Sequence, residues 1–364
     1  MRLFRFLILF VALASVADAA VGEPPLLRSQ FEMATTIDRA PARLEAMEIR
    51  PRGPGPFPLA VIAHGKDSGD EKRRAQSALG MTAHAAAFAR RGFVSVVAMR
   101  RGYGTSQGAY AEYDGTCEAT RYLEASKGGA RDLAAIVAAA AARPGVDRSR
   151  ILVVGESVGG VTALALATMP PPGVVGVINF AGGRGGNPAI PGDVCQKDRL
   201  VDTVRAFGAQ GKLPTLWVYA ENDRVFGPDL ARAMHRAFTG AGGKASLAML
   251  PPVDQDGHRV FSRGAAQWDA PVDAFLKGLG LPALPAAAPP PMPERLGANG
   301  QAAFRLYAAS PMPFKAFANS GQGPFGWAAS ATSIDEARKV ATENCAKAGR
   351  PCTIVHEETW VADR

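Results

Sequence analysis

Apolar and polar positions divide the chain into short strand-like runs and longer helical stretches. Between residues 58 and 280, brief runs of apolar and β-branched residues are each followed by a longer, alanine-rich stretch. Strands that are apolar throughout are covered on both faces, as in a parallel sheet. We expect strands at residues 59–63, 93–98, 151–154, 174–180, 216–219 and 246–250. We expect helices at residues 73–91, 130–142, 158–168, 228–238 and 265–279.

This alternation predicts an α/β fold in which helices flank a mostly parallel central sheet. Residues 31–50 are expected to add one or two edge strands to it. We assign residues 20–280 to this domain.

A proline-rich segment separates the large domain from a small C-terminal unit. Six prolines within residues 281–293 are incompatible with a helix or sheet interior, so residues 281–299 are interpreted as a stiff linker. Residues 300–364 are predicted to form a small α+β domain with strands at 314–318, 326–329 and 353–356. Ser333, with Glu336 three residues later, is a candidate N-cap for a helix that ends near residue 346. This unit has no evident catalytic set, so we expect an accessory role.

The first nineteen residues have the pattern of a signal peptide. Arg2 and Arg5 precede an apolar run at residues 6–16, and residues 17–19 fit a small-x-small cleavage site. The run is short for a bilayer span, although a retained anchor is the alternative. We therefore expect a periplasmic or secreted protein without stable membrane insertion after cleavage of residues 1–19.

Four cysteines in an exported chain indicate disulfides, and three pairings of them are possible. The simplest is one bridge in each domain, Cys117–Cys195 and Cys345–Cys352. No cysteine or histidine cluster has zinc-ligand spacing, so we expect no metal and no cofactor. The formal net charge is +8, but the basic residues are scattered, and we expect no nucleic-acid partner.

The chemistry of the chain centres on the run Gly155-Glu156-Ser157-Val158-Gly159. It follows a predicted buried strand and precedes a predicted helix, which is the setting that a G-x-S-x-G nucleophile turn requires. The turn is sharp, so glycines are needed on either side of Ser157. The N–H of Val158, at the start of the helix, is then aimed at a developing oxyanion.

A serine hydroxyl needs a base, and the base needs an orienting carboxylate. There are five histidines, of which His356 lies beyond the linker. Of the other four, only His258 follows the last strand of the large domain, as the order serine, acid, histidine requires. Asp223, after the penultimate strand, is the preferred acid. Glu221 is its nearest competitor, and Asp254 and Asp256 are weaker ones.

The order of these residues resembles the α/β-hydrolase superfamily, most of all its dienelactone-hydrolase-like and prolyl-oligopeptidase-like branches. The resemblance spans about residues 40–280 and rests on His64-Gly65, the turn at Ser157, Asp223 and Asp256-Gly257-His258. Dienelactone hydrolases proper use a cysteine nucleophile, whereas this chain has Ser157. That departure favours ester or peptide hydrolysis over dienelactone chemistry.

The resemblance also implies roles for residues around the turn. The backbone N–H of Lys66 would be the second oxyanion donor, with Gly65 as the runner-up and His64 structural. Tyr103, in the glycine-rich loop 100–108, would border the substrate pocket near the acyl group, although that loop can also be read as a turn that needs its glycines.

Together these features predict a serine hydrolase that cleaves a carboxylic ester through an acyl-enzyme. The alternative substrate is a short peptide, cleaved by the same triad in a prolyl-oligopeptidase-like enzyme. A second alternative is a non-catalytic binding module on a hydrolase fold. No motif specifies the acyl or alcohol group.

Overall fold

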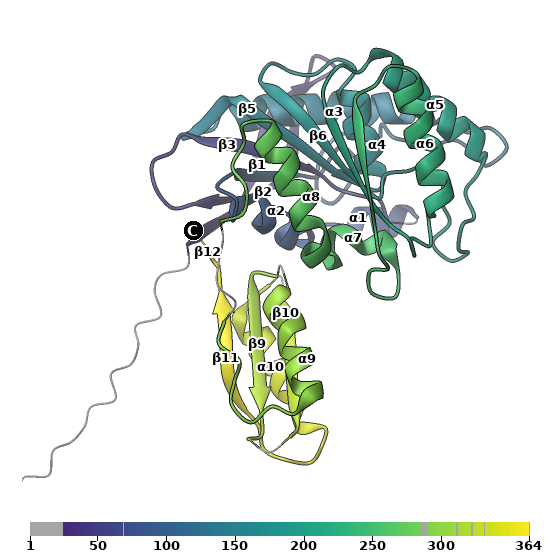
Figure 1. Ribbon diagram of the computed structural model, residues 1–364. Helices are drawn as coiled ribbons and strands as arrows, with labels where there is room; N and C mark the ends of the chain where they lie inside the picture. Colours follow the sequence, from purple (N-terminus) through teal and green to yellow (C-terminus); the bar gives the residue numbers. More distant parts are fainter. Residues whose placement is uncertain are drawn as a thin grey trace, which may run out of the picture.

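The computed structural model describes residues 25–67, 69–285, 290–310, 312–321, 323–330 and 332–363. The predicted signal peptide, residues 1–19, lies outside them. A large sheet covered by helices forms the main body, and a small α+β unit lies beneath the ends of α7 and α8 (Figure 1). The predicted fold class, a mostly parallel α/β sheet followed by a small C-terminal α+β unit, is confirmed.

In the described residues the large sheet has nine strands in the order β12-β1-β2-β4-β3-β5-β6-β7-β8. The antiparallel pairs are β1·β2 and β2·β4, and the remaining neighbours are parallel. The strands are β1 (Leu26–Ile37), β2 (Ala40–Pro51), β3 (Phe57–Ala63), β4 (Val94–Ala98), β5 (Val146–Glu156), β6 (Val174–Phe180), β7 (Thr215–Ala220), β8 (Ala245–Leu250) and β12 (Val361–Asp363).

The strand order reverses at β3, which lies between β4 and β5. Right-handed crossovers in opposite directions place their helices on opposite faces, so α2 covers one face and α3 to α6 the other (Figure 1). The helices of this domain are α1 (Asp70–Ala75), α2 (Thr82–Ala89), α3 (Tyr122–Ala141), α4 (Val158–Leu166), α5 (Lys197–Gln210), α6 (Pro228–Gly240), α7 (Val260–Arg263) and α8 (Ala265–Gly278), with 3₁₀ turns η1 (Ala78–Met81) and η2 (Gly257–Arg259). Such a reversal opens a crevice at the carboxyl ends of the strands.

Several elements differ from the sequence prediction, among them two helical segments of the large domain. The helix expected at 73–91 is divided into α1, η1 and α2, because Gln76 is extended and the Ser77 side chain accepts a hydrogen bond from the Leu79 N–H to begin a new turn. Helix α5 was not predicted, although its buried residues have helical spacing: Leu200, Thr203, Val204, Phe207 and Gly208. Among the described residues, no helix has both the length and the apolar character needed to cross a bilayer.

The C-terminal unit is a three-stranded antiparallel sheet, in the order β10-β9-β11, between two helices. Its elements are α9 (Ala298–Ala309), β9 (Phe314–Asn319), β10 (Phe325–Ser330), α10 (Ile334–Ala346) and β11 (Thr353–Thr359). Phe304 and Tyr307 of α9 pack on Phe317, whereas Ala337 and Ala341 of α10 are buried on the opposite face. Ser333 caps α10 as predicted, accepting a hydrogen bond from the Glu336 N–H at 3.2 Å.

The last strand ties the small unit to the large sheet. Residues of β12 pair in parallel with the start of β1, and Arg28 donates to Asp363 at 2.7 Å. The Arg90 guanidinium lies 3.7 Å from the ring centroid of Trp360, just before β12. The predicted unit 300–364 therefore gives its final strand to the neighbouring domain.

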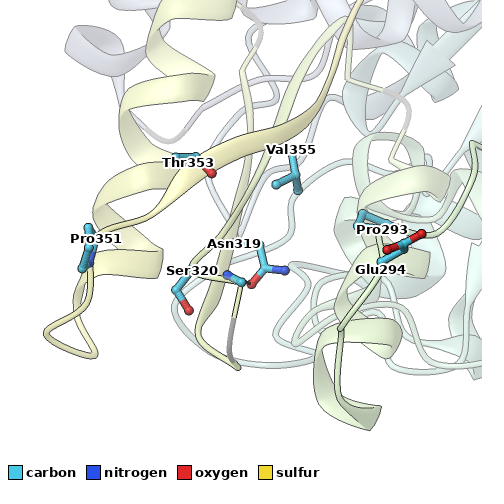
Figure 2. Close-up of a pocket in the computed structure, with 8 residues that line it drawn as sticks. Pro293, Glu294, Asn319, Ser320, Pro351, Thr353 and Val355 are labelled. Carbon is cyan, nitrogen blue, oxygen red and sulfur yellow. Dashed lines mark hydrogen bonds between the residues drawn. The ribbon is translucent and has the colours of Figure 1, made fainter.

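A groove of about 530 Å³ lies within the C-terminal unit. Figure 2 shows Pro293 and Glu294, at the end of the linker, across from Val355 on β11 and Asn319 at the end of β9. The residues that line this groove all lie beyond the large domain, so it is separate from the carboxyl ends of β3 to β6.

Both predicted disulfides form in the structure, Cys117–Cys195 and Cys345–Cys352, with sequence separations of 78 and 7. The first joins the loop after β4 to the loop after β6, and the second closes the turn between α10 and β11.

A disulfide that closes a longer loop removes more entropy from the unfolded chain. We expect Cys117→Ser/Cys195→Ser to lower the free energy of unfolding by about 4 kcal/mol, and Cys345→Ser/Cys352→Ser by about 2.5 kcal/mol. Urea unfolding of the oxidised proteins measures both values. An equal or smaller loss for the long-range pair would contradict this ranking.

Candidate active site

Ser157 lies in a tight turn between β5 and α4, with φ 54° and ψ −122°. A Cβ at Gly155 would lie 2.2 Å from the Gly159 carbonyl oxygen, and a Cβ at Gly159 would lie 2.1 Å from the Ala63 carbonyl oxygen. Neither position can carry a side chain without moving backbone. The glycines flanking Ser157 therefore permit a left-handed serine at the carboxyl edge of the sheet, where its hydroxyl is presented at the start of a helix.

His258 approaches Ser157 from the loop after β8. Its Nε2 lies 3.2 Å from Ser157 Oγ, and its Nδ1 lies 3.3 Å from Asp223 Oδ2. With Nδ1 donating to the carboxylate, Nε2 is free to accept the serine proton. The structure thus brings together three residues that are far apart in the chain: Asp223 lies 35 positions before His258, and Ser157 lies 101 positions before it.

Asp223 is the acid that reaches the histidine ring. Its carboxylate is fully buried, and Oδ1 accepts the backbone N–H groups of Val225 and Phe226 at 2.8 and 2.9 Å. These bonds leave Oδ2 for His258. Of the competing acids, Glu221 and Asp254 are exposed on the surface.

Asp256, the third competing acid, bonds to backbone and not to the histidine ring. Its Oδ1 accepts the backbone N–H of His258 at 2.9 Å and that of Arg224 at 3.1 Å. It therefore joins the loop that carries His258 to the turn that carries Asp223, without contacting the ring.

Burial of the imidazole on its own lowers the pKa of His258, but the hydrogen bond and the charge of Asp223 outweigh it. The charges of Glu156 and Asp256 act in the same direction as Asp223. The pKa of His258 is therefore raised above its ordinary value. Glu156 itself is paired with His84, whose Nε2 lies 3.5 Å from Glu156 Oε2.

Two backbone N–H groups predicted to hold an oxyanion flank the serine. Val158 is the first residue of α4, so its N–H has no acceptor within the helix. A Cβ at Gly65 would lie 3.4 Å from Ser157 Cβ, so the turn after β3 runs beside the nucleophile and Lys66 follows at once. The Lys66 side chain forms an ion pair with Asp114, with 3.3 Å between Lys66 Nζ and Asp114 Oδ2.

His64 is structural, as predicted. The ring is fully buried, which together with the charge of Arg100 lowers the pKa of His64 to about 3, so it is neutral. Its Nδ1 donates to the Gly65 carbonyl oxygen at 2.7 Å, and its Nε2 accepts the Arg100 backbone N–H at 3.1 Å.

The expected position of Tyr103 near the acyl group is wrong. Its side chain is 0% exposed and its ring packs edge-on against His64, 4.5 Å between centroids. The guanidinium of Arg100 also lies over the Tyr103 ring, 5.1 Å from its centroid. Tyr103 therefore supports the floor of the site from below instead of lining its opening.

A buried ion network beneath the site was not predicted. Glu112 is bonded to both Arg100 and Arg184, and Arg184 also donates to Asp114 at 2.8 Å. The charges of the two arginines outweigh the effect of burial and hold the pKa of Glu112 well below its usual range. No motif marks these residues. In the sequence, the one feature that points to this network is the number of charged residues in the two glycine-rich loops after β4 and β6.

Within the described part of the chain, no group of three or more histidine, cysteine, aspartate or glutamate side chains gathers in a way that could hold a metal ion. The side chain that contacts Ser157 is that of His258, which in turn contacts Asp223.

The chain is similar to one family of known proteins and to several solved structures. The model of the X-Pro dipeptidyl-peptidase (S15) family matches residues 41–190, which include Ser157. No curated protein matches the chain.

Solved structures that are similar include a protein described as a dienelactone hydrolase from Klebsiella pneumoniae, with 16% identity over 70% of this chain and 98% of that one, and a TM-score of 0.47. An esterase from Pyrococcus furiosus has 13% identity over 69% of this chain and 90% of that one, and a TM-score of 0.47. An acylaminoacyl peptidase from Pyrococcus horikoshii has 14% identity over 73% of this chain and 43% of that one, and a TM-score of 0.48.

Similarity at this level carries no argument about activity. The parallel strands follow the order β4-β3-β5-β6-β7-β8, and the serine turn lies between β5 and α4, within the segment that matches the family model. The sheet and its serine turn have the arrangement of an α/β-hydrolase fold, and the chain is similar to the X-Pro dipeptidyl-peptidase (S15) family over residues 41–190.

Proposed function

We propose that this protein hydrolyses carboxylic esters with Ser157 as the nucleophile, His258 as the base and Asp223 as the orienting acid. The observation that carries the proposal is the continuous set of contacts from Ser157 Oγ to His258 Nε2 and from His258 Nδ1 to Asp223. It occurs at a serine held in a left-handed backbone conformation at a helix start.

In the proposed reaction, His258 Nε2 accepts the hydroxyl proton as Ser157 Oγ attacks the ester carbonyl carbon. The carbonyl oxygen gains negative charge, and the N–H groups of Val158 and Lys66 stabilise it. His258 then donates its proton to the departing alcohol, which leaves an acyl-serine. Water, deprotonated by His258, attacks that acyl group, and His258 returns the proton to Ser157 Oγ as the bond to the acyl group breaks and the acid is released.

A peptide substrate is the second candidate, and the match to the X-Pro dipeptidyl-peptidase family supports it. We favour an ester because an alcohol leaves a tetrahedral intermediate more readily than an amine does, so an ester demands less of the site. A non-catalytic binding module is the third reading, and the contacts of His258 with both Ser157 and Asp223 count against it.

We propose that the protein acts outside the cytoplasm, in the periplasm or after secretion. Two disulfides are typical of an oxidising compartment, and the basic-then-apolar pattern of residues 1–19 is typical of export.

We also propose that residues 300–364 act as an accessory domain beside the catalytic one. Leu306 and Trp327 of this domain share a cavity of about 420 Å³ with Val253, on the loop that leads to His258. Ligand sites are often found at such domain junctions.

Replacing Ser157 by alanine removes the nucleophile while leaving the turn intact. We expect kcat/KM for ester hydrolysis to fall roughly 10⁴- to 10⁶-fold, as in other triad enzymes. Ser149→Ala, at an exposed serine, is the control and should leave kcat/KM unchanged. Residual activity within tenfold of wild type in Ser157→Ala would remove Ser157 from the mechanism.

The choice between ester and peptide is tested with an alkyl ester and an anilide of the same acyl group, together with an Xaa-Pro anilide. We expect measurable kcat/KM for the ester and at least 100-fold less for either anilide. A higher kcat/KM for the Xaa-Pro anilide would favour the peptidase. Hydrolysis of none of them, with a folded protein, would favour the binding module.

The reaction needs a neutral His258, so activity falls as the pH drops through the pKa of His258. Because that pKa is raised, the acidic limb of the kcat/KM profile should have its midpoint above the ordinary histidine value of about 6.5. Asp223→Asn removes the main raising charge and should move the midpoint to lower pH, with a loss of kcat of roughly 10⁴-fold.

Asp256→Asn is the matched control, since Asp256 bonds the backbone and not the ring. It should move the midpoint in the same direction but by less. A larger shift in Asp256→Asn than in Asp223→Asn would reverse the assignment of the acid.

A further inference from the structure

Glu112 is a carboxylate in the protein interior with two arginines as partners. Its side chain is 1% exposed, and those of Arg100 and Arg184 are 0% exposed. Oε1 accepts from Arg100 Nε, and Oε2 accepts from Arg184 Nη2 at 2.7 Å. These three residues come from the loops that follow β4 and β6, on either side of the Ser157 turn.

Through Arg100, this network reaches the turn that carries Lys66. Arg100 Nη2 donates to the His64 carbonyl oxygen at 3.0 Å, and the Arg100 backbone N–H donates to the His64 ring at 3.1 Å. The His64 ring in turn bonds the Gly65 carbonyl oxygen, which belongs to the peptide group that contains the Lys66 N–H. The orientation of that peptide group therefore depends on Arg100.

Through Arg184, the network reaches two further places. Arg184 Nη1 donates to Asp114, which also pairs with the Lys66 ammonium at 3.3 Å. Arg184 Nη2 donates to Thr162 Oγ1 at 3.0 Å, and Thr162 lies on α4, the helix that begins at Val158. The network thus holds Lys66 by both its backbone and its side chain, and holds α4 as well.

Stability alone is a weak reason to bury three charges. Removing them from water costs several kcal/mol per ion, and well-packed apolar residues in the same space are often as stable or more stable. Charged hydrogen bonds do fix relative positions sharply, because their partners have narrow distance and angle preferences. The two elements fixed here are the two that carry the predicted oxyanion donors.

We propose that Glu112 is a positioning residue that sets the placement of the Lys66 N–H relative to the Val158 N–H. The proposal rests on the proposed function, since it assigns a task only if both N–H groups stabilise an oxyanion. Oxyanion donors act on charge that develops in the transition state, so misplacing one lowers kcat and leaves KM nearly unchanged.

The chain contains a matched control at Glu48. This carboxylate is also 1% exposed and also lies between two arginines, Arg50 at 3.4 Å and Arg143 at 2.5 Å. Glu48 pairs with Val96, halfway along β4, and its partner Arg143 precedes β5, so this cluster lies short of the carboxyl ends of the strands, where Ser157 lies. A substitution at Glu48 reproduces the loss of a buried carboxylate without approaching the oxyanion donors.

The test compares Glu112→Gln with Glu48→Gln in the full chain. We measure urea unfolding, kcat and KM for a neutral ester, and the inhibition constant of an alkyl boronic acid, which forms a tetrahedral adduct with a catalytic serine. Both variants should unfold at lower urea. Glu112→Gln alone should lose roughly 10²- to 10³-fold in kcat, the usual effect of one oxyanion donor, with KM within about twofold. Its boronic acid affinity should weaken in proportion to kcat/KM.

Thr162→Val tests the same proposal if Glu112→Gln does not fold. It is close in shape to the native residue and removes the hydroxyl that joins Arg184 and Glu112 to α4, so we expect a loss in kcat of about tenfold, again with KM unchanged. Equal kcat in the Glu112 and Glu48 variants, or a rise in KM with kcat retained, would overturn the positioning role while leaving ester hydrolysis in place. A wild-type protein that neither hydrolyses esters nor binds the boronic acid would overturn the proposed function and this inference with it.

Discussion

Ser157 adopts a left-handed backbone conformation, and the candidate site depends on the close backbone contacts that permit it. A Cβ at Gly159 would lie 2.1 Å from the carbonyl oxygen of Ala63, so the start of α4 lies directly against the end of β3. This contact places the turn at Gly65 beside the nucleophile, with Lys66 next in the chain. The strain of a non-glycine residue at φ 54° is of a kind that persists at functional sites because the surrounding structure holds it.

The remaining parts of the site lie on loops, and polar contacts hold them in place. Asp256 joins the turn of Asp223 to the loop of His258 through two backbone N–H groups. On the other side of Ser157, the Glu112 network and the disulfide Cys117–Cys195 join the loops after β4 and β6. A regular sheet thus presents Ser157, hydrogen bonds through Asp256 hold the loops of Asp223 and His258, and ion pairs and one disulfide hold the loops after β4 and β6.

Several of these features could be predicted from the sequence because their signals are local. The buried strands have continuous apolar runs, and the order of Ser157, Asp223 and His258 follows the order of the strands that precede them. The sequence of α5 also has apolar residues at helical spacing, so this helix could be predicted as well. The pairing of β12 with β1 could not be predicted, since a three-residue strand has no periodicity and its partner lies at the other end of the chain. The burial of Tyr103 and of Glu112 could not be predicted either, because whether a loop residue is buried depends on tertiary packing.

The central claim is that Ser157 is an activated nucleophile, and the mass of the protein after reaction with a fluorophosphonate tests it most directly. The account predicts one adduct per chain, located by peptide mapping at Ser157 and absent from His258→Ala within the same reaction time. An unmodified chain, or an adduct on another residue, would contradict it.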